Sequence, residues 1–204
     1  MARASRIGLD LDNTAIDYTP AYRVIAEKIG LPEGLFDRES IRPLLRRSGD
    51  DDMEWQRFQS LLYTDGLAFA QPAEGLLDFL NMCSTMNIRV FIVSHKTSQT
   101  PMEFGAMDLR APALEWLLEH GVAPGFVRDE DVYFCRTRDE KVQTIAAIGC
   151  QIFVDDLIEV LDHPDLSADI SRFLYSLDAS PVSEVQTGIQ TANFTGLAAW
   201  LASC

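Results

Sequence analysis

The sequence predicts an α/β protein built on a mostly parallel β-sheet, and two observations lead to that class. Short apolar runs rich in β-branched and aromatic residues recur along the 204 residues, and helical patterns separate the later runs. Such alternation is typical of βαβ units, whose parallel strands are covered by helices on both faces. One interval near the N-terminus contains only helical patterns. We therefore expect a small α-helical module inserted into the α/β core.

The elements of the α/β core follow from apolar periodicity and from turn residues. Strands are predicted over Arg6–Leu11, Ile88–Ser94, Val132–Phe134, Gln151–Val154 and Arg172–Tyr175. Helices are predicted over Ala111–His120, Asp139–Ile148 and Asp156–Leu161. Residues 178–195 show little pattern, and a helix over Gly196–Ser203 is expected to close the chain.

The inserted helical module is predicted over residues 16–73, between residues 1–15 and 74–204 of the core. Its helices are expected to start at Thr19 and Pro20 and stop at Gly30, and to run over Ser40–Gly49 and Asp51–Gly66. Ala15–Tyr18 and Phe69–Ala73 would be its two extended connections to the core.

The charge balance and the cysteines restrict the classes of partner and the compartment. The 17 Lys and Arg against 31 Asp and Glu give a net charge of -14, which argues against a nucleic-acid or anionic-membrane binder. A small anionic substrate is compatible with this charge if cations gather locally. The 4 cysteines form no CxxC pair, which favours reduced thiols. We recognise neither a signal peptide nor a membrane span, and we expect a cytoplasmic protein.

Pairs of carboxylates follow two of the predicted strands. Asp10 and Asp12 close the first strand, and Asp155 with Asp156 follows the strand Gln151–Val154. Burying neighbouring carboxylates is costly unless positive charge accompanies them. Asp156 alone could be the N-cap of the next helix. Two acid pairs at the carboxyl ends of parallel strands favour a functional site, because ligands bind at that edge of such sheets.

A hydroxyl and a lysine accompany the acid pairs. Ser94 ends a buried strand pattern, where its hydroxyl can either donate to a phosphoryl oxygen or cap the next turn. Lys141 lies in the first turn of a helix that Thr137 or Asp139 begins, where the helix dipole disfavours a cation. A lysine directed at a carboxylate cluster would explain this position, and a solvated lysine is the alternative.

Taken in order, these motifs resemble the four motifs of the haloacid dehalogenase superfamily. The matching residues are Asp10, Asp12 and Thr14 of a DxDxT motif, then Ser94, then Lys141, then the pair Asp155 and Asp156. The resemblance implies a Rossmann-like core, and the inserted module resembles the helical C1 cap of that superfamily. It also implies a Mg²⁺ surrounded by a side-chain oxygen of Asp10, the backbone carbonyl of Asp12, Asp155 and Asp156. Mg²⁺ prefers such carboxylate oxygens together with waters and substrate phosphate.

The activity that the resemblance implies is a phosphatase reaction through an aspartyl-phosphate. Asp10 would attack the phosphorus of a phosphate monoester. Asp12 would protonate the leaving oxygen and then activate water. Ser94 and Lys141, with the metal, would stabilise the oxygens of the transferring group. Asp12 points to the phosphatase branch, because superfamily dehalogenases lack this second acid and the P-type ATPases have DKTGT.

Contacts to the substrate, a small phosphorylated metabolite, are expected from residues beside the motifs. We assign Asn13, Thr14, His95 and Lys96 to this group. His95 could instead be a loop histidine with satisfied hydrogen bonds, and Asn13 or Thr14 could bond to the local backbone. The loop over residues 95–110 is either functional or a plain surface loop.

Three other functions remain open at the sequence level. A phosphotransferase or phosphomutase of the same superfamily would pass the phosphoryl group to another acceptor. A signalling receiver domain also has an acidic pocket and an aspartyl-phosphate, but it places the phosphorylated Asp on a later strand and has no helical insertion. A non-catalytic binding protein on this scaffold would not require the motif residues Asp10, Asp12, Lys141 and Asp155 to be intact.

Overall fold

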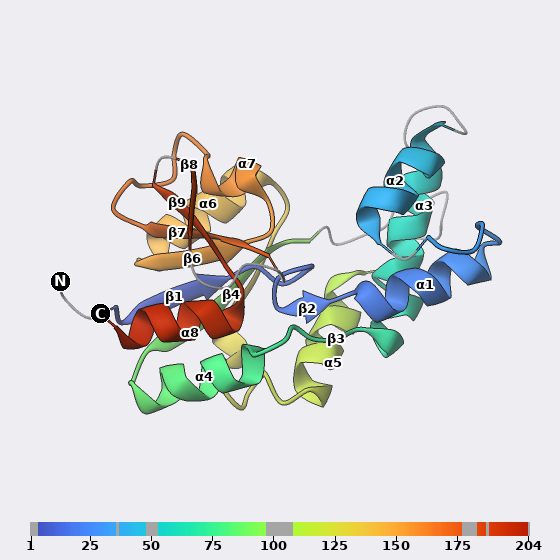
Figure 1. Cartoon of the computed structure of the whole chain (residues 1–204). Coiled ribbons are helices and arrows are strands. Elements are labelled where there is room, and N and C mark those ends of the chain that lie inside the picture. Colours follow the sequence, from blue (N-terminus) through green and yellow to red (C-terminus); the bar gives the residue numbers. More distant parts are fainter. Residues whose placement is uncertain are drawn as a thin grey trace. The chain divides into compact units, whose positions relative to one another are not determined.

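The structure is a computed structural model that describes residues 4–35, 37–47, 53–96, 108–176, 183–186 and 188–203. These residues form two compact units (Figure 1). The first unit contains residues 4–16 and 72–96 and the described residues from 117 onward. The second contains residues 17–71 together with residues 108–116.

The first unit is built on a seven-stranded sheet. Its strands are β1 Arg6–Leu9, β4 Arg89–His95, β5 Val132–Cys135, β6 Ile152–Asp155, β7 Ser171–Tyr175, β8 Ser183–Gln186 and β9 Ile189–Ala192. Their spatial order is β5-β4-β1-β6-β7-β9-β8, and every neighbouring pair is parallel except β8 with β9. The predicted α/β class with a parallel sheet is confirmed. Because β1 lies between β4 and β6, the carboxyl ends of the three motif-bearing strands are adjacent.

Helices cover both faces of this sheet (Figure 1). The helices α6 Arg138–Ala147 and α7 Ile158–Leu161 lie on one face, and α4 Leu76–Thr85 and α8 Phe194–Ala202 lie on the other. Val142, Phe153 and Val160 belong to the core beneath α6 and α7. On the opposite face the rings of Phe79 and Phe194 lie 5.4 Å apart. Strands buried on both faces explain why the sequence shows continuous apolar runs.

Gly8 in the central strand has no side chain, and the ring of Phe153 lies where a side chain at this position would be. A Cβ atom on Gly8 would lie 2.6 Å from Cδ2 of Phe153 and 2.8 Å from Sγ of Cys150. The same ring has its centroid 5.6 Å from Nζ of Lys141. Glycine at position 8 therefore allows the ring of Phe153 to pack beneath Lys141.

The second unit is helical. Its elements are α1 Thr19–Lys28, α2 Arg38–Arg47, α3 Met53–Leu62 and a 3-10 helix Asp65–Phe69. Phe58 is fully buried, and its ring stacks with those of Tyr22 and Trp55 at centroid distances of 5.8 and 5.7 Å. Helix α5 Arg110–Glu119 contributes residues to both units. The helices expected in the inserted module are present, but the helix predicted to reach Gly66 ends at Leu62, and residues 48–52 lie outside the described ranges.

The two predicted connections of the helical module form a short two-stranded sheet. Its strands are β2 Ile16–Asp17 and β3 Gln71–Pro72. None of the helices in the described ranges has both the length and the apolar character that crossing a bilayer requires.

Four elements in the described part of the first unit were not predicted: helix α4, strands β8 and β9, and a 3-10 helix at Asp129–Asp131. Helix α4 was not predicted, although Leu76, Phe79, Leu80 and Cys83 are buried at the i, i+3, i+4, i+7 spacing of a helix. Strands β8 and β9 form within the segment that showed little pattern. They lie at one edge of the sheet, where an antiparallel pair needs fewer apolar residues than a central parallel strand.

Two predicted elements of the first unit are shorter than expected. The first strand ends at Leu9 and not at Leu11, because the chain then enters a turn in which Asn13 has a φ of 59°. The helix predicted over Asp156–Leu161 begins only at Ile158, and its N-cap is Leu157. Asp156 is therefore not the N-cap of that helix. The other predicted core strands begin and end within one residue of the observed bounds.

Candidate active site

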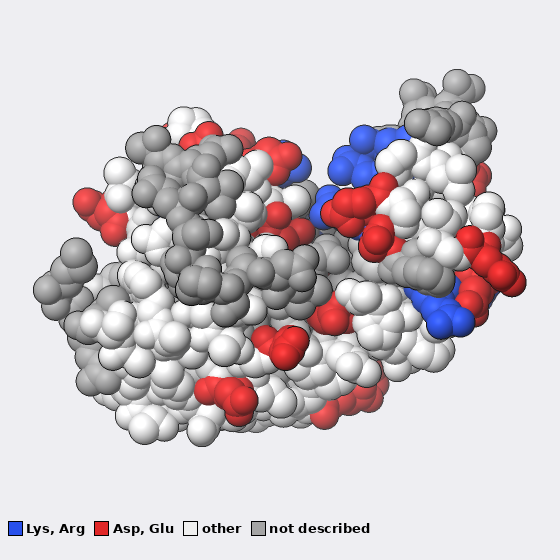
Figure 2. All heavy atoms as spheres, in the orientation of Figure 1, with Lys and Arg blue, Asp and Glu red and all other residues white. Residues whose placement is uncertain are grey.

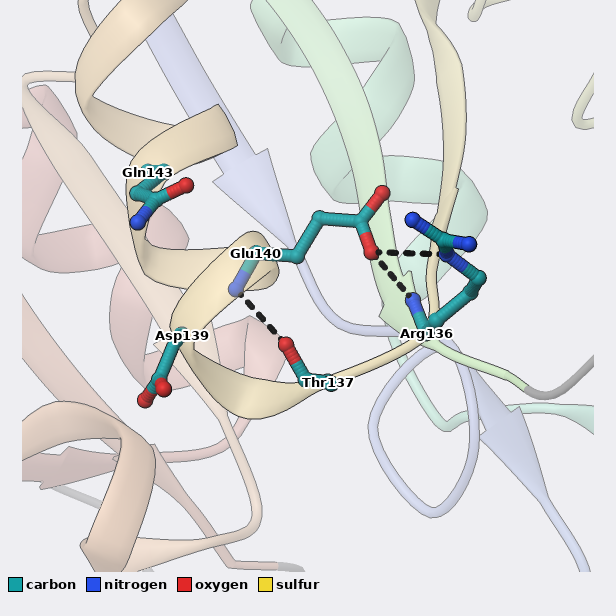
Figure 3. A pocket seen from close by; sticks show the side chains of 5 residues that line it. All are labelled: Arg136, Thr137, Asp139, Glu140 and Gln143. Atoms are coloured by element: carbon teal, nitrogen blue, oxygen red, sulfur yellow. Dashed lines mark hydrogen bonds and ion pairs between the residues drawn. The ribbon is translucent and has the colours of Figure 1, made fainter.

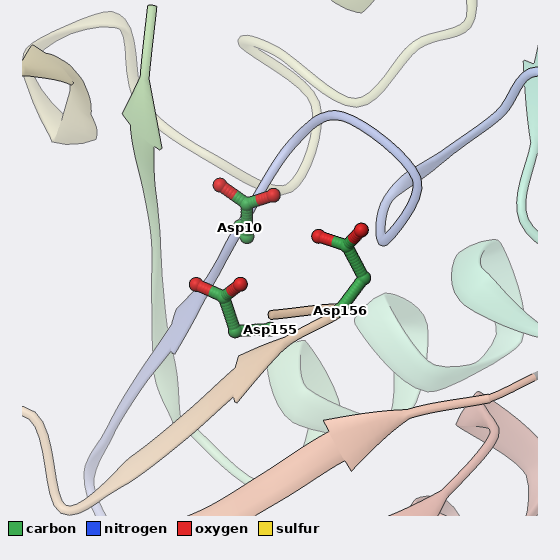
Figure 4. Close-up of side chains that lie close together, drawn as sticks. All are labelled: Asp10, Asp155 and Asp156. Carbon is green, nitrogen blue, oxygen red and sulfur yellow. The ribbon is translucent and has the colours of Figure 1, made fainter. Parts of the chain in front are cut away.

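Two of the predicted acids are buried at the ends of neighbouring central strands. Asp10 follows β1 directly, and its backbone N–H donates to the carbonyl of Val154 at 2.8 Å. Asp155 is the last residue of β6, and Asp156 comes next. Asp10 and Asp155 are 5% and 0% exposed, whereas Asp156 is half-buried. Carboxylate oxygens of these three acids lie within 4.8 Å of one another (Figure 4).

Lys141 joins this acidic cluster from helix α6. Its Nζ lies 2.6 Å from Oδ1 of Asp10 and 2.6 Å from Oδ2 of Asp155, and the residue is 1% exposed. The backbone N–H of Glu140 donates to Oγ1 of Thr137 at 3.1 Å, so Thr137 caps the helix one turn before Lys141. The lysine is therefore directed at a carboxylate cluster, and the alternative of a solvated lysine does not hold.

Burial and charge act against each other inside the cluster. Burial, together with the nearby charge of Asp155, raises the pKa of the Asp10 carboxyl to about 7 against the attraction of Lys141. Burial by itself lowers the pKa of Lys141, but the charges of Asp10 and Asp155 outweigh it and raise that pKa above its ordinary value. The buried acids thus favour a cation beside them.

Asp12 has a lysine of its own. Nζ of Lys96 lies 2.8 Å from Oδ1 and 2.7 Å from Oδ2 of Asp12. Lys96 follows the last residue of β4 and is 3% exposed. Lys96 was predicted to contact the substrate, and its pairing with Asp12 was not predicted. The sequence pattern gave no signal for this contact, because Asp12 and Lys96 both lie beyond the ends of their strands, where period-two alternation no longer sets side-chain direction.

The remaining predicted residues lie around these ion pairs. Ser94, within β4, is 1% exposed. Thr14 is fully buried, and its Oγ1 has no hydrogen-bond partner among the described residues. His95 is exposed, and its Nε2 lies 3.0 Å from the carbonyl oxygen of Arg136. The half-buried Asn13 shapes the turn after Asp12. Residues 97–107 of the predicted loop lie outside the described ranges.

A separate surface pocket lies at the start of α6 (Figure 3). Its lining residues are Arg136, Thr137, Asp139, Glu140 and Gln143, and none of the buried acids is among them. The carboxylate of Glu140 accepts from the backbone N–H of Arg136 at 2.9 Å. The side chains of Glu140 and Thr137 thus each accept a hydrogen bond from a backbone N–H group here. These two bonds fix the start of the helix that carries Lys141.

The acidic cluster fits a divalent cation in charge and in ligand chemistry. Four carboxylates, those of Asp10, Asp12, Asp155 and Asp156, stand against the two ammonium groups of Lys96 and Lys141. Asp10, Asp155 and Asp156 are the side chains that could hold the metal, since their oxygens converge and the carboxylate of Asp12 is turned to Lys96.

No protein-family model and no curated protein sequence matches this chain, but solved structures match it over nearly its full length. A haloacid dehalogenase-like hydrolase from Streptococcus pneumoniae aligns with 98% of this chain and 99% of its own, at 15% identity and a TM-score of 0.61. A haloacid dehalogenase family hydrolase from Deinococcus radiodurans, with bound phosphate and sodium, aligns over 100% and 97% at 14% identity and a TM-score of 0.59.

A third similar structure is the protein tyrosine kinase A of Mycobacterium tuberculosis. It aligns with 98% of this chain and 99% of its own, at 15% identity and a TM-score of 0.64. At such identities the likeness shows the fold. The chain has the fold of the haloacid dehalogenase superfamily, and the fold that the motifs implied is confirmed.

Proposed function

We propose that this chain is a Mg²⁺-dependent phosphatase that hydrolyses a small phosphate monoester through an aspartyl-phosphate on Asp10. The observation that supports this most strongly is the buried contact of Lys141 with Asp10 and Asp155, at 2.6 Å to each. Three elements that are distant in sequence converge on this contact. A purely structural protein gains little from so costly an arrangement, because buried ion pairs contribute weakly to stability.

In the proposed reaction Asp10 is the nucleophile. A carboxylate oxygen of Asp10 forms a bond to phosphorus, and the bond from phosphorus to the leaving oxygen breaks. Asp12 gives that oxygen a proton, and in the second half it takes a proton from the attacking water. Lys141 lies where it can neutralise charge on the transferring phosphoryl oxygens.

Asp10, Asp155 and Asp156, with the backbone carbonyl of Asp12, would hold the metal. When bound, Mg²⁺ supplies positive charge to the phosphoryl oxygens and keeps the buried Asp10 ionised. Ser94 and Thr14 are proposed to donate hydroxyl hydrogen bonds to the substrate, and Oγ1 of Thr14 is buried without a partner among the described residues. Asn13 and His95 complete the proposed substrate contacts.

The helical unit is proposed to act as the cap that selects the substrate. This assigns residues 1–15 and 74–204 to the catalytic core and 16–73 to the cap. The described residues 108–116 belong to the same compact unit as these helices. Variants of the cap should therefore include this segment.

The test is release of phosphate from a generic aryl phosphate at near-neutral pH. We expect hydrolysis with Mg²⁺, loss of hydrolysis with EDTA, and recovery when Mg²⁺ is added back. The Asp10→Asn variant should be inactive. Asp78→Asn, which changes an exposed acid on α4, should match the wild type. Turnover that survives complete metal removal would contradict the proposal.

Phosphoryl transfer to an acceptor other than water is the second candidate. It is favoured by the tyrosine kinase of M. tuberculosis, which shares this fold over 98% of the present chain. The two functions differ in what removes the phosphoryl group from Asp10. A transferase would release little phosphate in water alone and would lose its phosphoenzyme rapidly once a sugar or sugar-phosphate acceptor is added.

A further inference from the structure

Lys96 and Asp12 form a two-point contact at the edge of the candidate site. Both carboxylate oxygens of Asp12 lie within 2.8 Å of Nζ of Lys96. The side chain of Lys96 is only 2% exposed, and that of Asp12 is 14% exposed. Contact with both oxygens restricts the rotation of a carboxylate as well as its position.

Asp12 needs such an anchor because it lies beyond the end of its strand. Strand β1 stops at Leu9, and Asp12 lies in the turn that follows, where it forms an isolated bridge with Ile16. The next residue, Asn13, has a positive φ of 59°. The backbone of Lys96, in contrast, continues the pairing of β4 with β5, since its N–H donates to the carbonyl of Cys135 at 3.0 Å. Lys96 thus ties a turn residue to the sheet.

The two lysines of the site serve different acids. Lys141 contacts Asp10 and Asp155, whereas Lys96 contacts Asp12. A change at Lys96 therefore leaves in place the contact that Lys141 makes with the proposed nucleophile. The two halves of the proposed reaction should respond differently to that change.

We propose that Lys96 is a positioning residue that orients Asp12 for the hydrolytic half of the reaction, an inference that rests on the proposed function. In that half the oxygen of water forms a bond to phosphorus, and the bond between phosphorus and Asp10 breaks. The electron pair of that bond returns to the Asp10 carboxylate, and the proton lost by water goes to Asp12. Lys96 transfers no proton and acts only through Asp12.

The test measures the two halves separately in Lys96→Met with an aryl phosphate and Mg²⁺. Rapid acid quench and mass spectrometry of the peptide carrying Asp10 give the rates at which the phosphoenzyme forms and decays. We expect formation near the wild-type rate and decay slowed about ten- to a hundredfold, which is part of the roughly two to four decades that a general base contributes. The phosphoenzyme should accumulate, kcat should fall more than KM changes, and Lys96→Arg should recover part of the decay rate.

Arg89→Met is the matched control, because Arg89 begins the same strand that Lys96 follows. Its Nε and Nη2 contact the two oxygens of the buried Asp131 at 2.7 and 2.6 Å. The control should lower stability and leave the ratio of the two rates unchanged. Lys96→Gln provides the same measurement if Lys96→Met does not fold.

Several results would overturn the positioning role and leave the proposed function standing. One is a raised KM in Lys96→Met with normal phosphoenzyme decay, which would mean direct substrate contact. Another is an equal slowing of both halves in Lys96→Met and Arg89→Met, which would mean a structural effect alone. A wild-type protein that yields neither phosphate nor phosphoenzyme would instead overturn the proposed function, and the inference with it.

Discussion

Lys141 lies with its ammonium group 2.6 Å from oxygens of Asp10 and of Asp155, and almost no water reaches the three side chains. Removal of the lysine leaves two buried carboxylates without their common partner. We expect Lys141→Met to lower the free energy of unfolding by about 3–5 kcal/mol when measured in EDTA. Urea denaturation of the wild type and the variant measures this difference.

Added Mg²⁺ should recover part of that loss, because a cation bound by the same acids supplies the missing charge. The double variant Lys141→Met with Asp10→Asn should be less destabilised than the sum of the single variants, since the two residues are in contact. Additive losses in the double variant would argue that the two groups do not interact in solution.

Asp10 and Asp12 can be distinguished by the species that each variant traps. Asp10→Asn lacks the attacking oxygen, so neither phosphoenzyme nor phosphate should form. Asp12→Asn retains the nucleophile and loses a general acid–base group, which contributes roughly two to four decades in rate. An aryl leaving group needs little protonation, so Asp12→Asn should accumulate a hydroxylamine-labile phosphoryl adduct on the Asp10 peptide. An adduct mapped to Ser94, His95 or Asp155 by mass spectrometry would refute the assignment.

At the scale of elements, the N-terminus of α6 determines the position of Lys141 in the first turn of that helix. Thr137 accepts a hydrogen bond from the backbone N–H of Glu140, one residue before Lys141. Thr137→Val keeps the shape of the side chain and removes that bond, which should cost about 1 kcal/mol of stability. Thr137→Ser should retain both stability and activity. Thermal unfolding and aryl phosphate hydrolysis measure the pair, and equal stability of Val and Ser variants would show that the cap contributes nothing.

The packing of β1 against β6 gives another prediction at this scale. In Gly8→Ala the new Cβ would meet the ring of Phe153 at 2.6 Å, so the ring or a strand must move. Overpacking of a core typically costs about 1–3 kcal/mol. Phe153→Leu should relieve part of that cost in the double variant. Denaturant midpoints of the four proteins test this, and a fully stable Gly8→Ala would contradict the close contact.

The elements also show what the sequence could and could not predict. Central strands such as β4 and β6 were placed within one residue, because burial on both faces produces continuous apolar runs bounded by polar residues. Strand β8, with the sequence SEVQ, has no such run and lies at the sheet edge. Local pattern alone cannot identify a strand of this kind.

The same difference holds for the candidate site. Asp10 and Asp155 could be predicted to be close, because the carboxyl ends of neighbouring parallel strands meet. The contact between Lys96 and Asp12 joins residues 84 apart in sequence. Lys141 could be singled out because the helix dipole disfavours a cation in the first turn of a helix, but no such observation singled out Lys96. Which lysine pairs with which acid depends on side-chain directions that only the folded chain determines.

At the scale of the whole molecule, the chain divides into a sheet unit and a helical unit. We expect the helical unit to act as a cap that closes when substrate binds. If residues 16–73 form the cap, a bound phosphate analogue with Mg²⁺ should protect amides of α1 and α3 from hydrogen exchange. Mass spectrometry of exchange, with and without vanadate, measures this protection. Protection confined to the first unit would argue against closure.

The central position of β1 also has a consequence for how the chain acquires its structure. Ile7 pairs with Val90 on one side and with Ile152 on the other, so β1 can complete its pairing only after both later strands have been synthesised. Contacts that close such long segments slow folding, because chain entropy is lost before the contacts stabilise the product. During synthesis Asp10 therefore leaves the ribosome long before Lys141 and Asp155 exist. Until then Asp10 lacks these partners, and the candidate site can form only after Asp155 has been synthesised.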